Sequence, residues 1–117
     1  MAEAAFRHGD PVFADYTPLS GNITAGQVVV FSNTAGWTCG IAHLDITNNT
    51  LGALACGGGI YDCTMLTNMV QGTKVYWDDT NNKVVSTSTN CSPFGEIVGP
   101  GGTGANTVVE VLHTPWA

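Results

Sequence analysis

The chain has 117 residues, of which 44% are hydrophobic and only 10% are charged, and its formal net charge is −6. This length predicts one domain with a substantial core. The only cations, Arg7, Lys74 and Lys83, are too few and too scattered to bind phosphates or an anionic lipid surface, so we expect neither nucleic acid nor a membrane as a partner.

Residues 1–10 are predicted to form an extended N-terminal arm, and residues 11–117 a single body. Phe6 is the only large apolar residue of the arm, and Gly9, Asp10 and Pro11 mark its end. Such a residue anchors an arm either on its own body or on a neighbour; the alternative is a frayed terminus. The first residues contain no apolar signal core, so we expect synthesis in a cytoplasm.

Short β-rich runs separated by Gly, Asn and Pro follow the arm. They cover residues 11–16, 27–32, 37–46, 51–56, 60–65, 75–85, 94–98 and 106–113. Gly57–Gly59 must form a tight or bulged corner. Leu66–Gln71 is the one stretch that could hold a helical turn. This spacing predicts an all-β fold, either a small barrel or a sandwich.

The stretch from Val75 to Val85 is the clearest local signal, because two β-rich runs flank a centre of Asp, Thr and Asn that favours a turn. It predicts a β-hairpin with Trp77 in the core. In the closing strand, alternation places Val109 and Val111 on one face and Val108, Glu110 and Leu112 on the other.

The four cysteines, at positions 39, 56, 63 and 91, include no Cys-x-x-Cys pair. Cys39 and His43 have a possible metal-ligand spacing, but no second pair accompanies them. We therefore predict no metal and no cofactor. Buried free thiols are favoured over disulfides, because the chain carries no export signal.

No catalytic constellation is evident. The chain lacks the Gly-x-Ser-x-Gly nucleophile motif, and its histidines are scattered. His43 is predicted to be a hydrogen-bonded structural residue within a strand. Asp78 and Asp79 fit turn chemistry better than a calcium loop or a glycosidase pair. The loop at residues 99–104 lacks the Lys and the following helix of a phosphate cradle, so it is predicted to be a flexible connection.

Several fragments, taken in order, resemble a known family. They are Phe6–Pro11, Asp15–Pro18, Ile23–Val30, Ile41–Ile46, Leu51–Leu54, Gly58–Tyr61, Val75–Asp79 and Val108–Leu112. Together they resemble the capsid decoration, or cement, proteins of tailed phages and prophages, over nearly the whole chain.

This resemblance implies a compact β-barrel-like or β-tulip-like body without an active site. It implies homotrimers on the outer surface of the virion, at threefold and quasi-threefold positions, where they bind the major capsid protein and stabilise the expanded capsid. It assigns Phe6, Arg7 and His8 to an arm that docks on the capsid.

Two alternatives from other classes stay open. A small-ligand or glycan-binding β-domain displayed on a virion would need a pocket lined by exposed aromatics such as Trp37, Tyr61 or Trp116. An enzyme would need His43, a carboxylate and an exposed Ser or Cys in one cleft.

Overall fold

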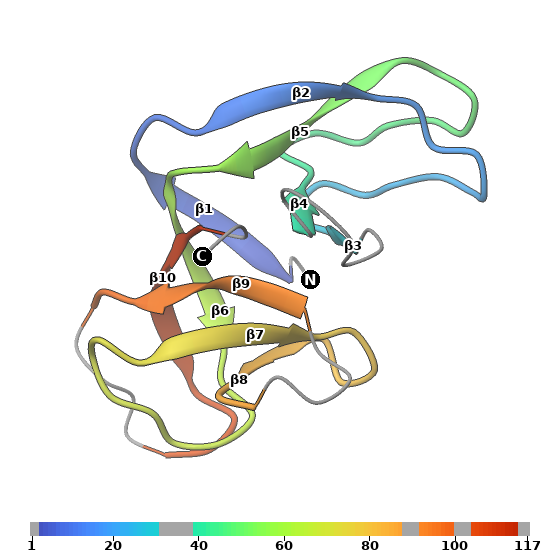
Figure 1. The fold of residues 1–117 in the computed structure, drawn as a ribbon. Helices are drawn as coiled ribbons and strands as arrows, with labels where there is room; N and C mark the ends of the chain where they lie inside the picture. The colour runs from blue at the N-terminus through green and yellow to red at the C-terminus, as the bar shows by residue number, and fades with distance from the viewer. Residues whose placement is uncertain (1–2, 31–38, 88–91, 100–103, 115–117) are drawn as a thin grey trace.

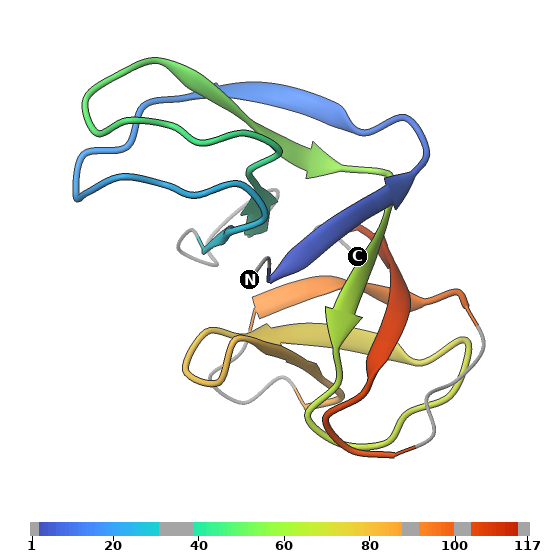
Figure 2. The same cartoon turned by 180° about the vertical axis from the view of Figure 1, so that it is seen from behind.

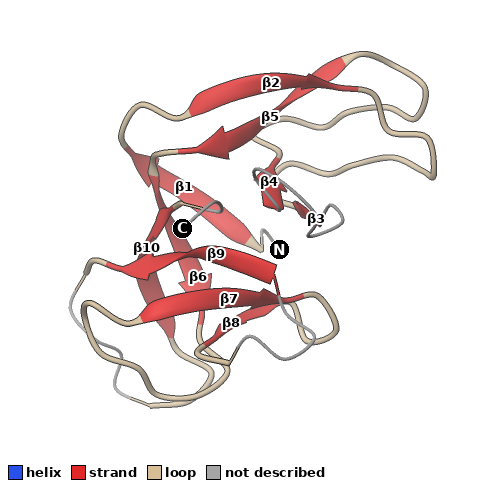
Figure 3. Ribbon diagram, in the orientation of Figure 1, coloured by secondary structure: helices blue, strands red, loops and turns tan. Residues whose placement is uncertain are grey.

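A computed structural model describes residues 3–30, 39–87, 92–99 and 104–114 (Figure 1). These residues contain ten strands and no helix (Figure 3). The strands are β1 (Ala4–His8), β2 (Val12–Tyr16), β3 (Val28–Val30), β4 (Cys39–Ile41), β5 (Gly52–Gly57), β6 (Ile60–Thr64), β7 (Lys74–Asp78), β8 (Lys83–Val85), β9 (Ser92–Ile97) and β10 (Val108–His113). The predicted all-β class is confirmed.

The strands form two antiparallel sheets, which lie one above the other in Figures 1 and 2. The larger sheet has the order β1-β6-β10-β9-β7-β8, and the smaller has the order β2-β5-β4-β3. The pair β1–β2 runs antiparallel to the pair β5–β6, so one two-stranded ribbon passes from one sheet into the other.

Glycines make the bend in this ribbon possible. Gly9, Gly58 and Gly59 have φ angles of 112°, 82° and 84°, values that side chains with a Cβ rarely adopt. A Cβ on Gly9 would lie 3.0 Å from the Cα of Gly59, so the two backbones touch at the corner. The glycine corner predicted at Gly57–Gly59 is therefore present, and Gly9 forms its other half.

The larger sheet curls but does not close into a barrel. The end of β6 returns to β8 through one parallel bridge between Met65 and Val84, and the amide of Leu66 donates to the carbonyl of Val84 at 3.0 Å. A closed barrel needs a continuous ladder between its last two strands, and this contact is only one bridge long. The barrel form of the prediction is corrected to two packed sheets.

The hairpin prediction is confirmed, since β7 and β8 pair from Tyr76–Val85 to Asp78–Lys83. Asp78 caps its turn by accepting hydrogen bonds from the amides of Thr80 and Asn81, at 3.0 and 3.2 Å. The side-chain amide of Asn81 also donates to Asp78 at 2.8 Å, and this bond, with the two backbone bonds, lowers the pKa of Asp78, as expected for turn chemistry.

The main core lies inside the curled sheet and beneath the smaller one. Its largest members, Trp77, Tyr61 and Phe94, are fully buried, and the Trp77 and Phe94 rings lie 5.5 Å apart. The predicted alternation of β10 is also confirmed, with Val109 and Val111 buried. A second cluster of Ile23, Ala42, Ile46 and Leu54 covers the other face of the smaller sheet.

Two local predictions were wrong. The strand expected over residues 37–46 is described only as β4, and beyond Ile41 the chain bends, which leaves Leu44 exposed and pairs Ile46 with Ile23 instead. Residues 37 and 38 lie outside the described part. Leu66–Gln71 holds bends and the start of a turn rather than a helical turn, because the amide of Gly72 donates to the carbonyl of Ile97 at 2.7 Å instead of to a carbonyl within the segment.

Within the predicted arm, Ala4–His8 form the edge strand β1, which pairs with β6 on the chain's own body. The amide of Glu3 donates to the carbonyl of Gly26 at 3.0 Å, and its carboxylate accepts from the amide of Val28 at 2.8 Å. In the described ranges there is no helix that could cross a membrane.

The corner generates a stability prediction. Gly9→Ala should destabilise the protein by about 3 kcal/mol, because the new Cβ meets the backbone of Gly59 and φ is positive. Gly21→Ala is the matched control, since Gly21 also has positive φ but open space around it, and should cost only about 1 kcal/mol. Urea denaturation measures both, and equal losses would contradict the close contact.

Candidate interaction surface

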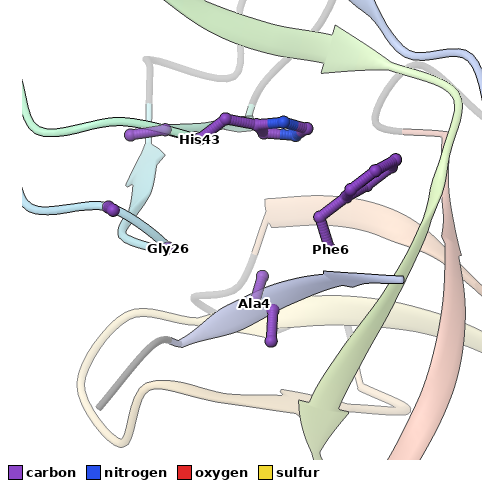
Figure 4. Close-up of a pocket in the computed structure, with 7 residues that line it drawn as sticks. Ala4, Phe6, Gly26 and His43 are labelled. Carbon is purple, nitrogen blue, oxygen red and sulfur yellow. The ribbon is translucent and has the colours of Figure 1, made fainter. Parts of the chain in front are cut away.

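An aromatic cluster of Phe6, Phe13 and Tyr61 surrounds His43. Figure 4 shows the rings of Phe6 and His43 facing each other. In β1, Phe6 is paired with Tyr61 of β6, so both side chains lie on the inner face of the ribbon. The Phe6 ring lies 4.7 Å from the His43 ring and 5.5 Å from the Tyr61 ring. Phe6 therefore anchors β1 on its own body while remaining 43% exposed.

His43 links this cluster to the core. Its Nε2 lies 2.7 Å from the hydroxyl of Tyr61, and burial lowers its pKa below the ordinary value of 6.5. Phe13, from β2, packs edge-on to His43 at 4.9 Å. His43 is thus a hydrogen-bonded structural residue, as predicted, although it lies in a bend rather than in a strand.

Two shallow hollows meet at His43, and together they form what we call the His43 surface. The first, of about 290 Å³, lies between β1 and the segment at Gly26; Ala4, Phe6, Gly26 and His43 line it (Figure 4). The second, of about 360 Å³, lies on the far side of His43 and is lined by Phe13, His43, Leu44, Asp45, Ile46, Leu51, Gly52 and Ala53. Both linings are mostly apolar.

Arg7 lies on the opposite face of the larger sheet from Phe6. Its Nη1 is 3.3 Å from a carboxylate oxygen of Asp62, and its Nε is 3.7 Å from one of Glu110. These exposed ion pairs connect β1 to β6 and β10, and each contributes little to the free energy of unfolding. The side chain of His8 lies outside the described residues. Of the two predicted docking residues whose side chains are described, Phe6 lies on the His43 surface and Arg7 does not.

The sequence did not single out Phe13, Leu44 and Leu51 as surface residues. Each is a large apolar side chain, with Phe13 49% exposed and the two leucines more so. Leu44 was expected to be an apolar member of a strand, and Phe13 stood in a predicted strand without an assigned face. For Leu51, its place directly after a predicted turn could have indicated exposure, because turns lie on the protein surface.

The described residues contain no cluster of metal ligands, and two of their three free thiols are buried. Within the described ranges, no group of three His, Cys, Asp or Glu side chains could hold a metal. Cys39, Cys56 and Cys63 are free thiols, the first and last buried, as predicted; Cys91 lies outside the described part. Burial raises the pKa of the Cys63 thiol, which favours the unreactive protonated form.

The burial of Tyr61 contradicts part of the ligand-binding alternative. Tyr61 was expected to be an exposed aromatic, but it is fully buried, and burial raises the pKa of its hydroxyl. The reason is its place in β6, where it pairs with Phe6 of β1 and Val111 of β10 and its side chain faces the main core. Trp37 and Trp116, the other aromatics of that hypothesis, lie outside the described residues, as does most of the loop at residues 99–104.

His113 is the buried polar residue beneath this surface. Its ring lies 5.8 Å from that of Tyr61, and its Nε2 donates to the carbonyl of Cys39 at 3.0 Å. Its Nδ1 has no hydrogen-bond partner within the described part of the chain. Burial therefore lowers the pKa of His113 to about 4 and keeps the ring neutral at pH 7.

This burial predicts acid sensitivity. The unfolded chain protonates His113 near pH 6.5, whereas the folded protein does so only near pH 4, so the unfolded state binds more protons between these values. The free energy of unfolding should fall by about 3 kcal/mol on this account as the pH drops from 7 to 4. His113→Gln, which keeps an amide donor for Cys39, should remove that part of the slope in urea denaturation series. Parallel slopes for the two proteins would contradict a buried neutral imidazole.

Comparison with known proteins returned one family. A family model described as phage cement protein matches residues 6–112, which take in every strand from β2 to β9 and most of β1 and β10. The matched range includes Phe6, Phe13, His43, Leu44 and Leu51 of the His43 surface. Neither the curated proteins nor the solved structures gave a match.

Proposed function

Because the chain belongs to the phage cement protein family, we propose that it binds the outer surface of a phage head as homotrimers at threefold and quasi-threefold positions. Its partners are the major capsid protein and two further copies of itself. Assembly takes place in the host cytoplasm, and the bound trimers stabilise the expanded capsid. The observation that carries this proposal is the family match over residues 6–112.

Physical considerations support a role in holding a shell together. A cement protein acts through many weak contacts made at once. Because every copy bridges neighbouring shell subunits, a shell subunit can leave only if several of these contacts break together. Such a role needs a stiff body and a contact surface, not a reactive group. The two hydrogen-bonded sheets supply the body, and the His43 surface supplies an exposed apolar contact region.

The N-terminal strand is proposed as the docking element, with different roles for its residues. Phe6 is the apolar contact, because its ring stands beside the first hollow and is partly exposed. Arg7 holds the strand in place through Asp62 and Glu110. His8 stands at the end of β1, next to the glycine corner, and we assign it to the same element from its position alone.

The low charge of the chain fits this function. Only 10% of residues are charged, and eight large apolar side chains are exposed in the described residues. Covering a surface of this kind costs less desolvation free energy than covering a highly charged one, because fewer charged groups lose their hydration. Coverage of part of this surface, including the His43 surface, by the shell and by the other protomers is consistent with this composition.

The proposal predicts saturable binding to expanded heads that lack this protein. Phe6→Ser should weaken that binding by about tenfold, because it removes a central aromatic contact. Val108→Ser is the matched control: Val108 is 63% exposed on the outer face of β10, and its loss should leave binding unchanged. Sedimentation of labelled protein with heads measures both affinities. Multi-angle light scattering of the free protein should give the mass of three chains.

Heat resistance of the heads is the functional measurement. Decorated heads should lose their DNA at a higher temperature than undecorated heads, and heads with Phe6→Ser should fall between them at equal protein concentration. If the wild-type protein fails to bind expanded heads of its own phage, the proposed function is wrong. If Val108→Ser weakens binding and Phe6→Ser does not, docking uses the opposite face of the larger sheet.

A further inference from the structure

The second hollow of the His43 surface has the features of a binding groove for an extended chain. Phe13, Leu44 and Leu51 stand around it with 49%, 76% and 67% of their surfaces exposed. Its volume of about 360 Å³ is enough for one or two side chains. Asp45 is the charged residue in its lining.

The segment that connects Leu44 to Leu51 is held by hydrogen bonds to residues 18–23. Ile23 and Ile46 exchange backbone bonds of 2.9 Å, and the amide of Asn49 donates to the carbonyl of Pro18 at 2.8 Å. The side chain of Asn48 accepts from the amide of Gly21 at 3.0 Å. A surface already ordered in this way loses little conformational entropy when it is covered, which favours docking.

Charge identifies the kind of partner. Asp15 is paired with Ala53, which lines the hollow, so alternation places its carboxylate on the same side of the smaller sheet. Asp45 adds a second carboxylate at the rim, with one oxygen accepting from the amide of Ala25 at 2.7 Å. An apolar hollow with one exposed carboxylate in its lining and a second on the same side of the sheet favours an apolar segment that carries a cation.

A second copy of this chain does not meet that requirement. Its net charge is −6, so its approach to two carboxylates is unfavourable. Its cations also have partners of their own: Arg7 pairs with Asp62 and Glu110, the Lys83 ammonium lies 2.7 Å from the side-chain oxygen of Asn106, and that of Lys74 lies 5.6 Å from the centre of the Tyr76 ring.

We propose that the hollow bounded by Phe13, Leu44 and Leu51 holds an extended segment of the capsid protein, in which a Lys or Arg next to an apolar side chain reaches Asp15 and Asp45. This inference rests on the proposed function and adds the site and the chemistry of the contact. It is distinct from docking through Phe6, because it uses residues on the other side of His43.

The test uses purified full-length protein and undecorated expanded heads. Leu44→Ser should weaken binding by about tenfold and Asp15→Asn by about threefold, and the Asp15→Asn effect should vanish at high salt, where exposed charges are screened. Val70→Ser and Glu96→Gln are matched controls, since both residues are exposed elsewhere, and they should bind as the wild type does. Thermal melts establish that all four variants fold.

A cross-linking experiment identifies the occupant. A photo-reactive amino acid at position 44 should join the chain to a capsid-protein peptide that contains Lys or Arg, and the same group at position 70 should not. Cross-links between two copies of this chain at position 44, or wild-type affinity for both Leu44→Ser and Asp15→Asn, would overturn the inference while leaving the proposed function in place. Failure of the wild-type protein to bind heads at all would instead overturn the function.

Discussion

The contact between the backbones of Gly9 and Gly59 is the constraint on which the rest of this structure depends. It lets the β1–β2 and β5–β6 ribbon turn from the larger sheet into the smaller one without separating its two strands. Phe6 lies before the bend and Phe13 after it, and the bend brings both rings within 5 Å of His43. The exposed aromatic surface is therefore a consequence of how two glycines meet, not of any local motif.

The His43 surface is packed on the core on its inner side and exposed to solvent on its outer side. His43 joins the exposed rings to the buried hydroxyl of Tyr61, and Tyr61 packs in turn on His113 in the core. A continuous path of packed rings makes the surface rigid, because each ring is held on its inner side. The outer edges of Phe6 and Phe13 remain uncovered, which is the arrangement expected of a contact surface rather than of a closed ligand pocket.

The distribution of charge gives the molecule its distinct faces. Arg7, Asp62 and Glu110 lie on the outer face of the larger sheet. Asp45 lines the second hollow and Asp15 lies on the same side of the smaller sheet, and no Lys or Arg is among the described lining residues. In a chain with only three cations, such an imbalance sets which partners can approach. It disfavours self-association through the hollow, so the contacts of the proposed trimer are expected on other parts of the chain.

The sequence by itself determined what depends on neighbouring residues. Alternation and turn chemistry predicted the hairpin around Asp78, the burial of Trp77 and the two faces of β10, because strand side chains alternate and clustered Asp and Asn residues favour turns. The family also followed from the order of short fragments. Only the tertiary structure decided that β1 pairs with the body, that Tyr61 is buried and that the sheet stops short of a barrel. These outcomes depend on pairing between residues far apart in the chain, such as Phe6 with Tyr61, which no local pattern encodes.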